Sequence, residues 1–118
     1  MQIILTGEPR STSHIYKYHC KFGFPSGYMS KEGKDLKESY QWEAKSQWKD
    51  KPMKGELLVE IKLFFGRGGK HDIDNFSKII LDALTGIVWA DDSQIEQLMI
   101  TKMIDRGNPR AEIEILPI

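Results

Sequence analysis

Four stretches of the chain alternate between hydrophobic and polar positions and are typical of β-strands. The first is a short stretch at residues 2–6, and the glycine and proline that follow it mark its end. Residues 56–65 are rich in Val, Ile, Leu and Phe, and residues 95–104 and 111–116 alternate in the same manner. The pattern therefore predicts one strand at the start of the chain and three in its second half.

A helical period predicts a first helix in the segment between these strands. Leu36, Tyr40, Ala44 and Trp48 recur every four residues, whereas the lysines keep mostly to the other faces. Ser30 is a suitable N-cap, because its hydroxyl can accept a bond from a free backbone N–H of the first turn. We therefore expect a helix from Ser30 to about Trp48.

A second helix is predicted from about Asn75 to Thr85, with Gly86 as the residue that ends it. At about 100° per residue its apolar side chains share one arc. They are Ile73, Phe76, Ile79, Ile80, Ala83, Leu84 and Ile87. Asp72 would lie inside this arc if the helix began earlier, so we place Asp72 in extended chain. There Asp72 and Asp74 point the same way, because side chains two residues apart share a face.

The order of these elements predicts a single α+β domain over residues 1–118, with two main helices packed on a mixed β-sheet. Residues 8–30 form a long irregular or hairpin-like stretch within the order β-loop-α-β-α-β-β. Aromatic side chains alternate in this stretch, which suits either a hairpin that packs on the sheet or a wedge at a DNA branch point, and we favour packing.

Composition narrows the class of protein. Apolar residues make up 40% of the chain, which is typical of a packed globular protein. Cys20 is the one cysteine, so no intrachain disulfide can form and a reducing compartment is expected. The first residues lack the pattern of a signal peptide, and no apolar stretch approaches ~18 residues. We expect a cytoplasmic protein that has no membrane partner and no small-molecule cofactor.

The net charge of zero conceals an asymmetry between the two halves of the chain. Residues 1–54 hold ten Lys and Arg against six Asp and Glu, which gives 10 − 6 = +4. Residues 55–118 hold seven against eleven, which gives 7 − 11 = −4, and five of these acids lie between Asp72 and Asp92. If cations neutralise some of them, the protein presents a basic surface, as expected for a nucleic-acid partner.

The acidic residues suggest a metal site. Two carboxylates on one face suit a hard cation such as Mg²⁺. A helix cap accounts for Asp74, but it does not account for Asp72. Asp91 and Asp92 follow the second helix, and we expect one of them to face the first pair. Lys78 lies one turn after Asp74, where it could form an ion pair or neutralise a phosphate. This combination indicates metal-dependent cleavage of phosphodiesters.

The segment DIDNFSKIILDAL…VWADDSQI, residues 72 to 95, resembles the signature of the RusA family of Holliday junction resolvases. The family pattern is Asp-x-Asp-Asn, a Lys four residues after the second Asp, Asp-Ala-Leu and Asp-Asp-x-Gln. Every position is filled here, by Asp72, Asp74, Asn75, Lys78, Asp82, Ala83, Leu84, Asp91, Asp92 and Gln94. Residues 29–33 carry a weaker likeness, so the resemblance spans nearly the whole chain.

The resemblance implies a catalytic and metal-binding set. Asp72, Asp74 and Asp92 would bind Mg²⁺, with Mn²⁺ as the alternative cation, and Asp91 would be a supporting or alternate ligand. Lys78 would be the essential lysine near the scissile phosphate. The implied reaction is the paired, symmetric nicking of four-way junction DNA in recombination and repair. A homodimer suits this reaction, because its two active sites are related as the opposed strands are.

The resemblance also suggests where DNA is contacted. Arg67, Lys70 and His71 stand where the family carries a basic run before its first acid, and Asn75 completes the acid motif. Arg10 and Lys17, together with the first helix, would provide further basic surface for phosphates. The segment around Arg10 departs from the family's Pro-rich pattern.

Two alternatives remain open at the level of sequence. One is a metal-dependent nuclease of other branched or single-stranded DNA. The other is a non-catalytic DNA-binding module that kept the fold, although a pure binder has no reason to place uncompensated acids beside phosphates.

Overall fold

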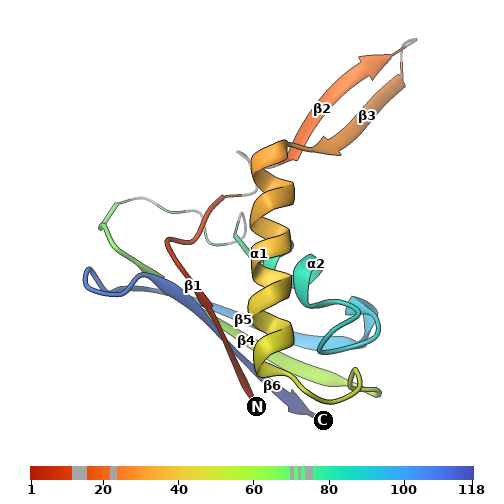
Figure 1. Cartoon of the computed structure of the whole chain (residues 1–118), viewed down its shortest axis with the longest axis vertical. Coiled ribbons are helices and arrows are strands. Elements are labelled where there is room, and N and C mark those ends of the chain that lie inside the picture. The colour runs from red at the N-terminus through yellow and green to blue at the C-terminus, as the bar shows by residue number, and fades with distance from the viewer. Residues whose placement is uncertain (12–15, 22–23, 70, 72, 74–75) are drawn as a thin grey trace.

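The structure is a computed structural model that describes residues 1–11, 16–21, 24–69, 71, 73 and 76–118. Its main sheet has four strands in the order β1-β6-β4-β5. The strands are β1 (Gln2–Thr6), β4 (Leu57–Phe65), β5 (Ile95–Ile104) and β6 (Arg110–Pro117). β4 pairs in parallel with β5 and antiparallel with β6, which is antiparallel to β1. Helices α1 (Lys31–Gln47) and α2 (Ser77–Leu84) lie side by side over this sheet (Figure 1). The predicted α+β class and element order are confirmed.

Alternation along the strands builds the core on the face that the helices cover. Every second residue of β4 is buried, and β6 repeats the pattern from Ala111 to Ile115. The other side chains of these strands point to the open face. Among the described residues, the fully buried side chains are apolar apart from the Tyr40 hydroxyl and the Trp89 indole N–H, so the hydrophobic effect is the main stabilising force.

Helix α1 follows the prediction closely. The Ser30 hydroxyl accepts a hydrogen bond from the backbone N–H of Gly33 at 3.1 Å, and Trp48 occupies the C-cap position. Tyr40 and Ala44 are buried, while Leu36 and Trp48 pack at the rim of the core. Burial, followed by the charge of a nearby glutamate, raises the pKa of Tyr40 to about 12.

Helix α2 begins two residues later than predicted. Its N-cap position is held by Phe76, which forms no side-chain capping bond, and not by Asp74. Phe76 is buried against Phe65 in an edge-to-face contact, with ring centroids 5.1 Å apart. The preceding turn is closed by a bond from the Phe76 N–H to the Ile73 carbonyl. Packing of Phe76 therefore sets the start of the helix, which a local capping rule could not foresee.

The predicted apolar arc of α2 is confirmed where the structure describes it. Phe76, Ile79, Ile80, Ala83 and Leu84 are buried. No helix among the described residues is long and apolar enough to cross a bilayer.

The stretch before α1 contains a β-hairpin. Strands β2 (Tyr16–Lys21) and β3 (Phe24–Met29) pair only with each other and form a separate two-stranded sheet. The hairpin extends beyond the N-terminal end of α1, away from the four-stranded sheet (Figure 1). Our expectation that the hairpin packs on the four-stranded sheet was wrong, because β2 and β3 form a separate sheet that points away from it (Figure 1).

The chain turns back after α2 around Trp89, whose side chain is fully buried. Gly86 adopts a φ of 89°, which favours glycine, and its N–H donates to the Trp89 carbonyl at 2.7 Å. The indole N–H of Trp89 donates to the Thr85 hydroxyl at 3.0 Å, and Met53 bonds to the carbonyl of Val88. This turn fixes the position of the acids that follow it.

We predict that Trp89→Ala lowers the free energy of unfolding by about 3–5 kcal/mol, because it leaves a large cavity in the core. That is a large share of the about 5–15 kcal/mol that stabilise a typical domain. Trp42→Ala is the matched control. Trp42 is 70% exposed, so its loss should cost no more than about 0.5 kcal/mol. Urea unfolding followed by circular dichroism would measure both, and equal losses would contradict the assignment of Trp89 to the core.

Candidate active site

The segment between β4 and α2 is held at the C-terminal end of β4 by an aromatic cluster. The His71 ring stacks on Phe65 with centroids 3.9 Å apart and an interplanar angle of 4°. Phe76 meets the His71 ring edge-on at 6.0 Å. The predicted site residues Lys70, Asp72, Asp74 and Asn75 lie outside the described residues. The described part of the chain therefore fixes only the two ends of the segment that carries them.

Two of the predicted DNA-contacting residues line one small pocket. It has a volume of about 150 Å³, and Arg67, His71 and Lys102 are among its lining residues. The Lys102 ammonium donates to the His71 carbonyl at 3.3 Å. Sequence reasoning missed Lys102, which is 31 residues from His71, because only the pairing of β5 with β4 brings them together.

The polar face of α2 carries Lys78 and Asp82. Lys78 is exposed and Asp82 is half-buried. Both lie opposite the buried Ile79, Ile80 and Ala83. Helix α2 therefore leads from the aromatic cluster to the turn at Trp89.

Asp91 caps the short 3₁₀ helix η3 (Asp92–Gln94). Its carboxylate accepts a bond from the Ser93 hydroxyl at 3.0 Å and a longer one from the Ser93 N–H at 3.4 Å. The Gln94 side chain completes a capping box by accepting the Asp91 N–H at 2.8 Å. The bonds from Ser93 hold the pKa of Asp91 below its usual value. The Asp91 carboxylate thus stabilises this turn.

Gln94 anchors η3 to the segment that follows α1. Its amide nitrogen donates to the carbonyls of Met53 at 2.9 Å and Gly55 at 3.0 Å. Sequence reasoning found Gln94 only as a member of the family motif. The structure gives it a physical role, because its amide fixes the geometry of Asp91 and Asp92.

Asp92 is exposed, and nearby carboxylates repel its negative charge. A hydrogen bond with Asp91, some burial, and the charges of Asp91 and Asp82 raise the pKa of Asp92. Crowded carboxylates with oxygen-only donors fit a hard divalent cation, which would relieve their repulsion. Within the described residues, no three His, Cys, Asp or Glu side chains lie close enough to hold a metal ion. The other two predicted ligands, Asp72 and Asp74, lie outside the described residues.

The structure separates the basic pocket from the described acids. Phe65 pairs with Ile104 at one end of the β4–β5 ladder, whereas Leu57 pairs with Ile95 at the other. Arg67 and His71 thus lie at the first end, and Asp92 lies at the second, roughly 26 Å away along the strands. The predicted approach of Asp72 and Asp74 to Asp92 falls on residues that are not described and stays a prediction.

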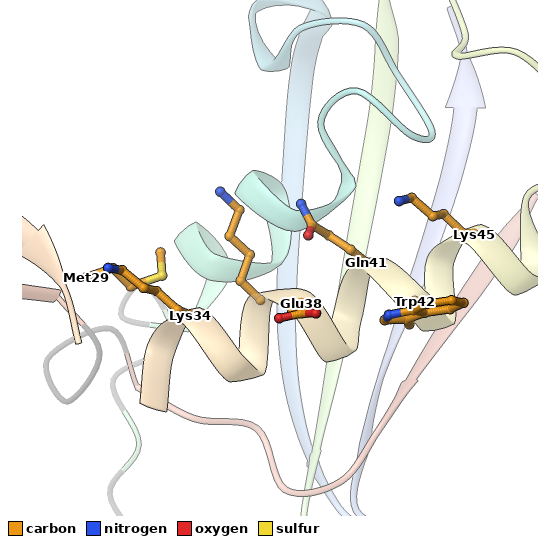
Figure 2. Close-up of a pocket in the computed structure, with 7 residues that line it drawn as sticks. Met29, Lys34, Glu38, Gln41, Trp42 and Lys45 are labelled. Carbon is orange, nitrogen blue, oxygen red and sulfur yellow. The ribbon is translucent and has the colours of Figure 1, made fainter. Parts of the chain in front are cut away.

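A basic groove runs along α1 (Figure 2). It has a volume of about 590 Å³, and its lining residues are Met29, Lys34, Lys37, Glu38, Gln41, Trp42 and Lys45. Gln41 and Lys45 extend toward the side of α1 on which α2 lies (Figure 2). Trp42 is 70% exposed.

The two remaining predicted DNA contacts lie near the hairpin. Arg10 is paired with Glu32 in the first turn of α1, with Nη2 and Oε2 3.3 Å apart and both side chains exposed. Lys17 lies on β2, opposite Tyr28 in the ladder.

We predict that the Asp91 carboxyl titrates below, and the Asp92 carboxyl above, the usual pKa of an aspartate in metal-free protein. The stabilising effect of Asp91 should be present above its unfolded-state pKa and lost as the pH falls through the folded-state pKa. For Asp92 the sign is reversed, and its stabilising effect disappears as the pH rises through the raised pKa. Carbon-detected NMR of the carboxyls measures both. Ser93→Ala should raise the Asp91 midpoint, and coincident midpoints in the wild type would contradict this arrangement.

Comparison with known proteins agrees with the sequence motif. The model of the family described as endodeoxyribonuclease RusA matches residues 7–116 of the 118-residue chain. A search of curated proteins found no match. A match over nearly the whole length shows the family and a nuclease fold. The chain belongs to the RusA family of endodeoxyribonucleases.

Proposed function

We propose that the protein is a Mg²⁺-dependent endonuclease, with Mn²⁺ as the alternative cation, that resolves four-way DNA junctions in the cytoplasm. It acts as a homodimer that makes paired symmetric nicks during recombination and repair. The observation that carries the proposal is the family match over residues 7–116, which includes every position of the acid motif.

The crowded carboxylates on and after α2 support a metal-dependent reaction. Asp92 is exposed and repelled by Asp82 and Asp91, so a bound cation would be stabilised there. In the proposed site Asp72, Asp74 and Asp92 hold Mg²⁺. Asp91 acts as a supporting residue, because Ser93 occupies its carboxylate.

Each residue of the proposed site has a separate task. Bound Mg²⁺ supplies an activated water and stabilises charge on the phosphate and the leaving oxygen. Lys78 neutralises the scissile phosphate from the exposed face of α2. Arg67, Lys70 and His71, with Asn75, contact the DNA backbone. Gln94 keeps Asp92 in place through its bonds to Met53 and Gly55.

DNA arms lie along the basic groove of α1 and the hairpin in this proposal. Three lysines and one glutamate line the groove, so its charge is 3 − 1 = +2. Arg10 and Lys17 extend this surface toward the hairpin. Contacts of this kind recognise the shape of the backbone and weaken with salt.

We predict that Asp92→Asn and Asp74→Asn each lower the rate of Mg²⁺-dependent cleavage of a synthetic four-way junction by about 100-fold or more. This is the scale of losing one preorganised electrostatic interaction with the transition state. Asp50→Asn, an exposed aspartate between α1 and β4, serves as the control and should cut at the wild-type rate. Gel assays with end-labelled junctions measure the rate, and electrophoretic shifts in Ca²⁺ measure binding.

The same assay separates the alternatives. Equal cleavage of linear duplexes or flaps would favour a nuclease of other branched DNA. Intact junction binding without cleavage by the wild type would favour a binding module. An Asp74→Asn variant that cuts as fast as the wild type would overturn the site assignment.

We predict that replacing Lys34, Lys37 and Lys45 by Ala weakens junction binding. The slope of log affinity against log salt should fall by about 0.9 for each DNA phosphate that the protein no longer neutralises. The matched control replaces Lys49, Lys51 and Lys54, which are exposed and lie outside the groove. Both triple variants change the net charge equally. Fluorescence anisotropy in an Asp92→Asn background gives the affinities, and equal losses in both variants would show that only net charge matters.

A further inference from the structure

An exposed tryptophan stands on the outer side of α1. Trp42 is 70% exposed, the largest exposed fraction among the large hydrophobic side chains that the structure describes. Trp42 is two residues, or about 200° around the helix, from both Tyr40 and Ala44, which are buried. The ring therefore points away from the core. Packing of the helix on the sheet does not account for an aromatic residue at this position.

The surroundings of Trp42 are basic, which distinguishes it from a solitary apolar residue on a surface. Helix α1 holds equal numbers of lysines and acids, four of each. Three of these lysines but only one of the acids line the groove that contains Trp42. Two of the other acids are bonded elsewhere, since Glu32 pairs with Arg10 and Glu43 accepts the Thr6 N–H. The helix therefore presents its positive charge around the ring.

The lysines of the groove are available to a ligand. Within the described part of the chain, Lys34, Lys37 and Lys45 take part in no ion pair. The row from Lys34 to Lys45 is about 16 Å long at 1.5 Å per residue. Gln41 lies midway between Lys37 and Lys45, and its amide can both donate and accept a hydrogen bond. The groove thus offers positive charge along its length and one group suited to the edge of a base.

Figure 2 shows how these side chains are arranged. Lys34 lies near one end of the groove and Trp42 and Lys45 near the other, with Glu38 between them. The volume of about 590 Å³ is typical of a cleft that takes a small ligand or part of a larger one. The groove can therefore accommodate a short run of nucleotides beside the ring.

Phosphates match the lysines, and a nucleobase matches the ring. Aromatic side chains stack on the flat face of a base, and any base can take part because each has a π face. In a duplex the neighbouring bases already cover that face. A base can stack on Trp42 only where the strand is unpaired or the base has left the stack, as beside a branch point. An acidic peptide would match the lysines as well, but it would give the ring no flat partner.

We propose that the groove of α1 binds an unpaired DNA strand, with one base stacked on Trp42 and the backbone phosphates held by the three lysines. Gln41 contacts the edge of a neighbouring base. The inference deepens the proposed function, since it rests on the DNA contact assigned to this groove and states which form of the strand lies there. Because α1 packs beside α2, the groove holds the open strand next to the helix that carries Lys78.

The ring and the lysines then have different tasks. The lysines attract any phosphate backbone, whether its bases are paired or not. Trp42 adds a contact only to a strand that has an accessible base. The lysines therefore set the overall affinity and its dependence on salt, whereas Trp42 sets the preference for unpaired DNA. These two contributions can be measured separately.

Binding of short DNA in EDTA tests the stacking contact without cleavage. The probes are a fluorescein-labelled oligothymidylate and a labelled duplex of equal length, followed by fluorescence anisotropy. Trp42→Ala should weaken binding of the single strand by about tenfold and leave binding of the duplex unchanged. Trp42→Phe keeps a ring and should recover most of the loss. The matched control is Leu116→Ala, an exposed apolar side chain of β6. Equal losses on both probes, or none, overturn the inference.

Strands without bases separate stacking from other effects of the ring. Abasic sites in the same oligomer remove the stacking partner and keep every phosphate. We expect the wild type to bind the abasic strand about tenfold more weakly than the complete one. Trp42→Ala should show no further loss on the abasic strand, because the same contact is missing in both cases. Losses that simply add overturn the stacked base.

Intrinsic fluorescence reports on the ring itself. Oligothymidylate should quench the tryptophan emission of the wild type, because a stacked base quenches an indole. Trp42→Phe should abolish this quenching and Trp48→Phe should keep it, whereas Trp89 is buried in the core. Poly-glutamate is the competing probe. Quenching of Trp42 by poly-glutamate as strong as that by the DNA strand would indicate a site for an acidic peptide and overturn the inference.

The failure of this inference and the failure of the proposed function are distinguishable. A wild type that binds single strands through Trp42 yet cleaves no four-way junction in Mg²⁺ supports the groove and overturns the proposed function. A wild type that cleaves junctions, while Trp42→Ala binds single strands equally well, supports the proposed function and overturns the inference.

Discussion

The parallel pairing of β4 with β5 is the constraint on which the arrangement of this protein depends. A parallel pair requires the chain to return to the end of the sheet at which the first strand began before the second strand can start. Helix α2 makes that return, so residues before and after it start from opposite ends of the ladder. The aromatic contacts of Phe65 with His71 and Phe76 fix one end. Buried Trp89 fixes the other.

Electrostatic repulsion among carboxylates is balanced by local hydrogen bonds in the turn after α2. Asp91 is stabilised by Ser93, whereas Asp92 keeps an exposed carboxylate with a raised pKa. One adjacent acid thus supports the backbone and leaves the other available. Gln94 ties the arrangement to the chain before β4. Asp91 therefore stabilises this turn, whereas the adjacent Asp92 has a carboxylate that is available to a cation.

The sequence predicted part of the candidate site. The motif over residues 72–95 indicated the family, and the helical period placed Lys78 opposite the apolar arc of α2. The sequence could not show which of the adjacent acids is bonded to Ser93, because both are compatible with a turn. It also missed Lys102, which reaches His71 only through strand pairing. Contacts between distant residues leave no local pattern in a single sequence.

The sequence by itself determined the elements whose causes are local. The Ser30 cap, the four-residue apolar repeat of α1 and the alternation of β4 set their bounds within a few residues, because capping and burial periodicity act over short stretches of chain. Tertiary structure alone decided the strand order, the start of α2 at Ser77 and the separate hairpin. Those features depend on packing between segments far apart in the chain, such as Phe76 on Phe65, and that packing overrides local preference.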